Sequence, residues 1–370
     1  MRFVHLLAIL FISISSFAQN YYLFVGTYTS GKSEGIYVYR FNSSTGNAAL
    51  LSTAKSQNPS YLAISSNKKY LYAVNENGTA GEVSSFLFDG GTGQLHFINK
   101  QSSGGADPCY ITEDKTNKWV FVANYSSGAL SALSVNADGS LNPVAQLITH
   151  NGSGADKERQ EKAHVHSTVL SPDQHFLYAA DLGTDRETIY RFSPEKKQPL
   201  SDIKDSIVSV EPGSGPRHFV FHPTKPYAYL ISELSGTVDA FSYTSSTGGL
   251  KQIQRISSHP ADFKGQKGSA DIHISPNGKF LYASNRGDAN SIAIYSIDVN
   301  GKLHIKGFHS TEGIHPRNFM IDPTGHFLLV ANRDSDNIVI FSINQQTGLL
   351  SSTGKQINVP NPVCLKMLKM

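Results

Sequence analysis

Cysteine is scarce in this sequence of 370 residues, which contains only Cys109 and Cys364. A small fold held together by several disulfides is therefore excluded. No CxxC pair and no Cys/His pattern with zinc-ligand spacing is present, which excludes a structural zinc site of that kind. A disulfide needs Cα atoms about 4.4–6.8 Å apart. Because the two cysteines fall on the first strands of non-neighbouring repeats, described below, we expect two free, buried thiols.

Long apolar runs and blocks of like charge are also missing. After residue 20, no apolar run has the period of a helix, whereas aromatic and β-branched residues are frequent and are interrupted by Gly and Pro at short intervals. These features predict an all-β chain. The formal net charge is +3, and the Lys and Arg residues are scattered. We therefore expect no nucleic-acid partner.

A short apolar run stands at the start of the chain. Arg2 precedes an apolar core at Leu6–Ile14, and small residues at positions 16 and 18 favour cleavage before Gln19. The run is too short to span a hydrocarbon core about 30 Å thick. We predict a signal peptide at residues 1–18 and a single domain at residues 19–370. The mature protein is expected to be exported, periplasmic or secreted, without a membrane span.

A pattern of two strands and a turn recurs along the chain. In Ser269–Arg286, a short apolar run meets the turn Ser275-Pro-Asn-Gly278, and a second apolar run ends at the polar residue Asn285. Seven such units, about 50 residues apart, are typical of β-propeller blades. The polar residues that close the units are Thr27, Asn75, Asn124, Asp181, Ser232, Asn285 and Asn332.

The two ends of the chain complete each other. Tyr21–Thr27 has no first strand before it, and Asn361–Leu368 has no second strand after it. If these segments pair, the ring closes and leaves no open sheet edge. The sequence therefore predicts a seven-bladed β-propeller, closed by pairing the C-terminal strand with the N-terminal strands.

Polar and charged residues gather at two equivalent places in the units. One is the entry to the first strand, which lines the channel of a propeller, and the other follows the closing polar residue. In a ring these places converge on one end of the channel, where a polar cluster is a candidate binding site. Interblade ion pairs and hydrogen bonds are the alternative interpretation. The candidates are Glu76, Tyr125, His164, His166, Arg217, His218, Glu233, Asp271, Arg286 and Arg317.

Two further features allow more than one interpretation. His164 and His166 alternate, which on a strand places both on one side. A metal pair would lack an evident third ligand, so we favour acid–base or hydrogen-bonding roles and expect no metal. The polar segments at residues 151–162 and 260–268 lead into first strands near one mouth of the channel. They are either functional loops or ordinary variation between repeats.

A series of short motifs runs through the whole mature chain. They include Gly26-Thr-Tyr-Thr29, Asn58-Pro-Ser60, Ala123-Asn-Tyr125, His164-Val-His166, Gly215-Pro-Arg-His218, Glu233-Leu-Ser-Gly-Thr-Val238, Ser284-Asn-Arg-Gly287 and Pro316-Arg-Asn-Phe319. In order and number they resemble the lactonase family with a seven-bladed propeller, which includes bacterial 6-phosphogluconolactonase and fungal carboxymuconate cyclase. In the cyclase branch a His, two Arg and a Glu are held to act. The resemblance implies that His166, Arg217, Glu233 and Arg286 are catalytic.

The resemblance implies hydrolysis of a sugar lactone by attack of water on the ester carbonyl. His166 would take the proton from water, because an unperturbed imidazole titrates near ~6.5. Glu233 would orient His166 or act as the base itself. Arg217 and Arg286 would hold the oxyanion, or a carboxylate or phosphate of the substrate. This scheme needs no cofactor.

Two other functions remain open. A cyclase-type isomerase would use the same arginines to hold a carboxylated diene. A non-catalytic exported propeller would be a binding module, since one fold hosts many functions. Export also favours an unphosphorylated aldonolactone over a phosphorylated one as substrate. We expect a monomer whose partner is a small molecule.

Overall fold

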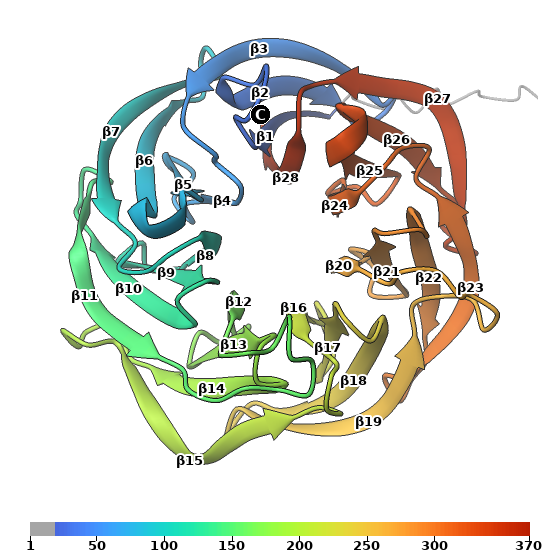
Figure 1. Cartoon of the computed structure of the whole chain (residues 1–370). Coiled ribbons are helices and arrows are strands. Elements are labelled where there is room, and N and C mark those ends of the chain that lie inside the picture. Colours follow the sequence, from blue (N-terminus) through green and yellow to red (C-terminus); the bar gives the residue numbers. More distant parts are fainter. Residues whose placement is uncertain (1–18) are drawn as a thin grey trace, which may run out of the picture.

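The computed structural model describes residues 19–370, which form seven four-stranded sheets arranged in a ring (Figure 1). This confirms the predicted all-β, seven-bladed β-propeller. The predicted signal peptide at residues 1–18 lies outside the described part of the chain. Within residues 19–370, no helix has the length and apolar character needed to cross a membrane.

One blade is built from both ends of the chain. It contains β1 (Asn20–Thr27), β2 (Gly35–Asn42), β3 (Asn47–Lys55) and β28 (Pro362–Lys369). The innermost strand, β28, pairs antiparallel with β1, so that Val25 lies opposite Leu365. Figure 1 shows the C-terminal β28 beside the N-terminal β1. The predicted closure of the ring is therefore confirmed.

The other six blades each use four consecutive strands, with the first strand innermost. The next three blades contain β4 (Leu62–Ile64), β5 (Tyr70–Asn75), β6 (Glu82–Asp89), β7 (Gln94–Ser102), β8 (Pro108–Glu113), β9 (Trp119–Asn124), β10 (Ala129–Val135), β11 (Leu141–Thr149), β12 (Val165–Leu170), β13 (Phe176–Asp181), β14 (Arg186–Phe192) and β15 (Leu200–Ser209). The last three contain β16 (Pro216–Phe221), β17 (Tyr227–Ser232), β18 (Thr237–Thr244), β19 (Gly249–Ser257), β20 (Ser269–Ile274), β21 (Phe280–Asn285), β22 (Ser291–Ile297), β23 (Leu303–Ser310), β24 (Pro316–Ile321), β25 (Phe327–Asn332), β26 (Asn337–Ile343) and β27 (Leu350–Asn358). Two short 3₁₀ helices, Gly78–Ala80 and Arg333–Ser335, follow β5 and β25.

The core lies between the blades. All six residues of β21 are buried, because both faces of a second strand are covered by neighbouring blades. The outer strand β11 instead alternates between buried or half-buried and exposed residues along most of its length. One apolar cluster joins Tyr229 and Ile231 of one blade to Leu281 of the next. The continuous apolar sequence of the second strands is thus explained by burial on both faces.

A glycine in the outer turns fixes the spacing of neighbouring blades. Gly348 has φ = 75°, a conformation that favours Gly, and a Cβ at this position would overlap the ring of Phe280 in the previous blade. The hydroxyl of Tyr282 donates to the carbonyl of Gly348 at 2.8 Å. Tyr229 makes the same contact with Gly301 at 2.9 Å. The repeated aromatic and Gly positions therefore hold adjacent blades in register.

The two cysteines are free and buried, as predicted. Cys109 lies on β8 and Cys364 lies on β28, in blades that are not neighbours in the ring. Cys109 packs against His166, and Cys364 lies in an apolar core cluster.

Candidate active site in the central channel

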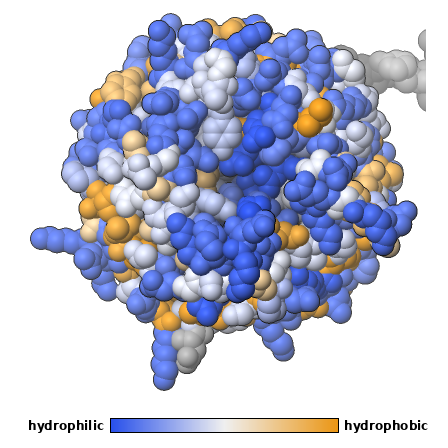
Figure 2. Space-filling model, in the orientation of Figure 1, coloured by the Kyte–Doolittle hydropathy of each residue, from blue (hydrophilic) through white to orange (hydrophobic). Residues whose placement is uncertain are grey.

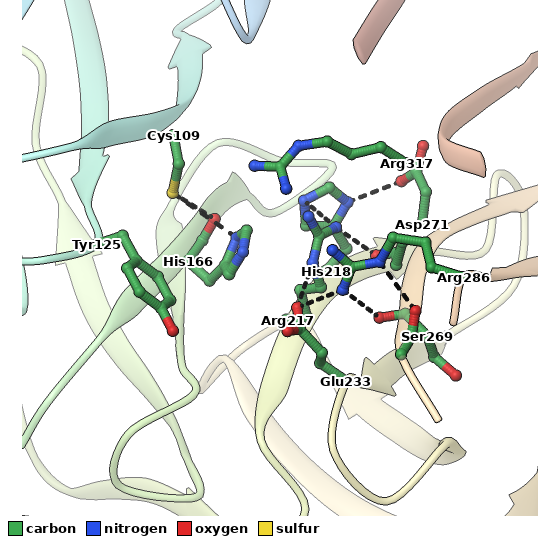
Figure 3. Close-up of polar contacts among 12 residues, drawn as sticks. Cys109, Tyr125, His166, Arg217, His218, Glu233, Ser269, Asp271, Arg286 and Arg317 are labelled. Atoms are coloured by element: carbon green, nitrogen blue, oxygen red, sulfur yellow. Dashed lines mark hydrogen bonds and ion pairs between the residues drawn. The ribbon is translucent and has the colours of Figure 1, made fainter. Parts of the chain in front are cut away.

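A β-bulge recurs near the start of the first strands. In four of the six blades built from consecutive strands, the pairing of the first strand with the second skips one residue. Bulges bend a strand and re-aim a side chain, and a Pro precedes three of the skipped residues. Figure 3 shows the four side chains directed toward one another. The skipped residues are Cys109, His166, Arg217 and Arg317.

The two ends of the channel differ in which backbone segments reach them. The first strands begin at one end, here called the entry end, and finish in hairpin turns at the other, the turn end. Glu76, Glu233 and Arg286 follow second strands, which run back, so they also lie at the entry end. Figure 2 shows hydrophilic residues gathered at the centre of one face of the ring.

Glu233 is the centre of an ion-pair cluster at the entry end. Its Oε2 lies 2.9 Å from Nε of Arg217 and 2.7 Å from Nη2 of Arg286. Its Oε1 lies 2.8 Å from Nη2 of Arg159. Arg217 is 1 % exposed and Glu233 is 6 % exposed. The structure therefore brings together Arg217, Glu233 and Arg286, three of the four residues predicted to be catalytic.

The charged groups of this cluster keep one another ionised. Burial alone would raise the pKa of Glu233, but Arg286 and Arg217 hold it well below its ordinary value. Burial lowers the pKa of Arg286 to about 10, which still leaves the guanidinium protonated at neutral pH. Glu233 is thus a carboxylate that anchors arginines, and this weighs against the hypothesis that it is the general base.

Arg317 belongs to a second, looser group at the same end. Its Nη2 lies 3.9 Å from Oε2 of Glu76, and its guanidinium lies 5.4 Å from the centre of the Tyr28 ring. The hydroxyl of Tyr28 donates to Oε2 of Glu76 at 2.8 Å. The long Arg317–Glu76 separation leaves the guanidinium free to bind another acceptor.

His166 lies beside the cluster with its ring buried. Its Nδ1 is 3.7 Å from Sγ of Cys109, and its ring centre is 5.3 Å from that of Tyr125. Burial, with the positive charge of Arg217, lowers the pKa of His166 well below its ordinary value, so the imidazole is neutral. Burial also raises the pKa of the Cys109 thiol, which therefore stays protonated. Among residues 19–370, Nε2 of His166 has no hydrogen-bond partner.

His164 has a different environment from His166, which corrects the prediction that both lie on one strand. His164 precedes β12, and the bulge at His166 interrupts the alternation. The His164 ring stacks on Tyr125 at 4.5 Å, and its Nε2 lies 3.1 Å from a carboxylate oxygen of Glu161. Tyr125 contacts both rings, so His164 and Tyr125 form a wall next to His166 rather than a histidine pair.

His218 and Asp271 form a hydrogen-bonded pair between the two ends of the channel. Nη1 of Arg217 donates to Nε2 of His218 at 3.2 Å, which assigns the His218 proton to Nδ1, and Nδ1 donates to Oδ1 of Asp271 at 2.7 Å. Burial and Arg217 lower the pKa of His218 to about 4. Oδ2 of Asp271 accepts from His273 at 3.0 Å and from the amide of Asn318. His218 is therefore a neutral acceptor that supports Arg217.

A cavity of about 390 Å³ opens beyond His218 toward the turn end. Its lining includes Asp271, the stacked rings of Tyr61 and Tyr110, and Lys366. Residues of the hairpin turns, such as Pro172, complete the wall. His218 and Asp271, predicted to bind substrate with the arginines, thus face this cavity.

One important residue of the cluster escaped the sequence analysis. Arg159 lies in the 151–162 loop, and its Nη2 contacts both Glu233 and the hydroxyl of Tyr125, the latter at 3.2 Å. The sequence analysis singled out this loop because it breaks the repeat. It did not single out Arg159, because the residues of the loop have no equivalents in other blades to compare with. Across residues 19–370, no group of three or more His, Cys, Asp or Glu side chains is arranged to hold a metal ion.

The arrangement suits the binding of an anion and the polarisation of a carbonyl. The buried guanidinium groups of Arg217 and Arg286 lie at the same end of the channel as the neutral imidazole of His166, which can accept a proton. Fold and site together define a seven-bladed propeller with an arginine-rich centre at one end of its channel. The sequence profile of the family "Lactonase, 7-bladed beta-propeller" matches residues 22–367. The chain belongs to this family, as its motifs predicted.

Several known proteins are similar to the chain over nearly their whole length. A 6-phosphogluconolactonase of Formosa agariphila is 43 % identical over 93 % of this chain and 99 % of its own. A 6-phosphogluconolactonase of Bacillus subtilis is 37 % identical, with 93 % and 97 % covered. The solved structure of a periplasmic gluconolactonase of Pseudomonas aeruginosa has a TM-score of 0.91 and 39 % identity, and 94 % of this chain and 99 % of that one are covered.

Proposed function

We propose that this protein hydrolyses a sugar lactone at the entry end of its channel. The observation that carries the proposal is the ion-pair cluster in which Glu233 holds the buried guanidinium groups of Arg217 and Arg286, at the same end of the channel as the buried imidazole of His166. Relatives named as lactonases for phosphogluconolactone and gluconolactone support the same reaction class.

In the proposed reaction, His166 is the general base. Its neutral Nε2 accepts a proton from water as the water oxygen attacks the lactone carbonyl. Glu233 is unsuited to this step, because its lone pairs already accept from Arg159, Arg217 and Arg286. Collapse of the tetrahedral intermediate then breaks the ring ester bond, and the leaving alkoxide takes up the proton that His166 accepted from water, which restores the neutral imidazole.

The arginines stabilise the negative charge that develops on the carbonyl oxygen. Arg217 uses Nε on Glu233 and Nη1 on Ala270 O and His218, and the hydrogen bonds within residues 19–370 leave its Nη2 unused. Arg286 uses Nε on Gly268 O and Nη2 on Glu233, which likewise leaves Nη1. A donor that is held in place before the reaction stabilises an oxyanion without further reorganisation.

The predicted signal peptide bears on the substrate. We propose that the mature chain is exported, and the similarity to a periplasmic gluconolactonase supports this. An exported enzyme meets unphosphorylated aldonolactones more readily than phosphorylated ones. Both D-glucono-1,5-lactone and its 6-phosphate are therefore needed as test substrates.

The test is lactone hydrolysis by the chain that starts at Gln19, with a chelator present. We expect turnover above the spontaneous rate, and a loss of about 10²–10⁴ in His166→Ala. Arg217→Ala should lose a similar factor, because an oxyanion donor contributes about 10²–10³. Turnover no faster than water on both lactones would reject the proposal. Conversion of a muconate instead would favour the cyclase-type isomerase, which could use the same arginines.

A further inference from the structure

The 151–162 loop places a fourth arginine at the site. Nη2 of Arg159 lies 2.8 Å from Oε1 of Glu233 and 3.2 Å from the hydroxyl of Tyr125. Its side chain is 45 % exposed, whereas that of Arg217 is 2 % exposed and that of Arg286 is 10 % exposed. Arg159 therefore covers the cluster from the solvent side, where a substrate must arrive.

The loop holds Arg159 in place by contacts of its own. The buried side chain of Gln160 donates to the carbonyl of Leu182 and to Oδ1 of Asp185, both at 2.8 Å. The backbone amide of Arg159 donates to Oδ1 of Asp156 at 3.0 Å. The backbone next to Arg159 is thus anchored, while the end of its long side chain can change partners.

The formal charges of the site do not balance. Arg159, Arg217, Arg286 and Arg317 contribute four positive charges, and Glu76, Glu233 and Asp271, which is linked to Arg217 through His218, contribute three negative charges, which leaves an excess of one positive charge. His166 adds no charge in its neutral form. Uncompensated charge near a protein interior is unfavourable, and a bound anion removes the imbalance.

Arg159 can change partners without leaving Glu233 unpaired. Arg217 and Arg286 both contact Oε2 of Glu233, so the carboxylate keeps two guanidinium partners when Oε1 is released. The Tyr125 hydroxyl is the other contact of Arg159, and it lies near the mouth. Arg159 has the most exposed side chain of the cluster. It lies in the loop between β11 and β12, whereas Arg217 lies on a strand and Arg286 directly follows one.

We propose that Arg159 recognises an anionic group on the substrate, exchanging Glu233 for a phosphate or carboxylate when the substrate binds. The 151–162 loop then determines whether the enzyme prefers charged or neutral sugar lactones. This inference rests on the proposed function in placing the substrate at the entry end. Phosphate and carboxylate share the chemistry that a guanidinium recognises through paired N–H donors.

Binding of sugars that cannot be hydrolysed tests the inference without relying on turnover. Calorimetry compares glucose 6-phosphate, glucuronate and glucose as ligands of the chain from Gln19, in wild type, Arg159→Gln and the charge-matched control Lys162→Gln. Lys162 is exposed at the end of the same loop. We expect wild type and control to bind at least one anionic sugar more tightly than glucose. We expect Arg159→Gln to lose about tenfold or more of that preference, as for a hydrogen bond to a charged group.

Kinetics adds a second readout that a merely structural role would not move. In Arg159→Gln, the ratio of kcat/KM for gluconolactone 6-phosphate to kcat/KM for gluconolactone should fall about tenfold or more, mainly through a higher KM for the phosphorylated lactone. If Arg159→Gln loses the preference for only one of the two anionic sugars, that sugar identifies the group, phosphate or carboxylate, that Arg159 binds. A preference retained in Arg159→Gln, or absent from wild type, overturns the inference. If the preference is lost as expected but neither lactone turns over, the proposed function fails and the anion site stands.

Discussion

The two ends of the channel contrast in charge and in openness. The entry end holds Arg217, Arg286 and Glu233 as buried ions, whereas the turn end has a cavity of about 390 Å³ whose polar groups largely bind one another. In the lining of this cavity, Asp271 accepts from His218 and His273. The end with the described cavity is therefore not the end at which Arg217 and Arg286 keep unused donors.

The contrast comes from the direction of the strands. Every first strand enters the channel at the same end, and the bulges there carry His166, Arg217 and Arg317. The same strands leave at the turn end through apolar residues such as Phe219 and Phe221. One bulge repeated around a ring therefore concentrates polar side chains at one end without altering the blades.

Removing the charge of Glu233 should disturb this contrast most. Glu233→Gln leaves Arg217, Arg286 and Arg159 without their shared carboxylate, and breaking a buried ion pair costs about 3–5 kcal/mol. We expect a loss of that size in the free energy of unfolding, measured with urea, and a fall in kcat/KM of about 10³ or more. The matched control is Glu195→Gln, whose exposed pair with Lys118 should contribute less than about 1 kcal/mol. Equal effects in the two variants would contradict the buried cluster.

Asp271 tests whether the two ends are coupled through His218. Asp271→Asn weakens the acceptor for His218 and His273, so His218 should hold Arg217 less firmly. We expect unfolding free energy to fall by about 2–3 kcal/mol, as for hydrogen bonds to a charged group. A tenfold loss of kcat/KM, or about 1.4 kcal/mol, should accompany it. Asp262→Asn, an exposed change in the 260–268 loop, is the control. Full activity with reduced stability would show that the ends act independently.

The pH dependence of kcat/KM should depend on His166 and not on an exposed surface histidine. The base form of His166 is neutral, and its pKa lies well below 6.5 in the folded chain. The acid limb of kcat/KM on gluconolactone should therefore lie below pH 6.5 and disappear in His166→Ala, after subtraction of spontaneous hydrolysis. His175→Ala, a change at an exposed turn, should leave the profile unaltered. An acid limb at or above pH 6.5 would reject His166 as the base.

Stability should follow the same groups with a defined sign. His166 and His218 have folded-state pKa values below the unfolded value, that of His218 being about 4. Below about pH 6.5 the unfolded chain therefore binds more protons than the folded chain, and these histidines lower stability as the pH falls from about 6.5 toward 4. Urea unfolding at several pH values should show a smaller slope in His218→Gln than in wild type.

The sequence predicted the fold and the composition of the site but not all of its connections. Strand periodicity and Gly-containing turns repeat with each blade, so both the ring and its closure could be predicted. The entry positions were predictable because His166, Arg217 and Arg317 are polar residues at the same place in three of the units. The repeat did not reveal that these positions are bulges.

Contacts between distant segments could not be predicted in this way. His218 and Asp271 are 53 residues apart, and their hydrogen bond depends on how two blades pack. Glu233 was a possible base in the sequence, and only its three arginine neighbours in space reveal an anchor. Arg159 lies in a loop that has no counterpart in the other blades, so the repeat contained no information about it.

The smallest effect is expected at the wall of the turn-end cavity. Nζ of Lys366 lies 4.5 Å from the centre of the Tyr61 ring, an interaction that contributes about 0.5–1 kcal/mol. Lys366→Met keeps the length of the side chain and removes its charge, so unfolding free energy should change by no more than this amount. Because the unused donors lie at the entry end, kcat/KM on gluconolactone should change less than about threefold. A larger loss of activity, with stability unchanged, would mean that substrate or product also occupies the turn-end cavity, and the division of the channel into a reactive end and an inert end would then be wrong.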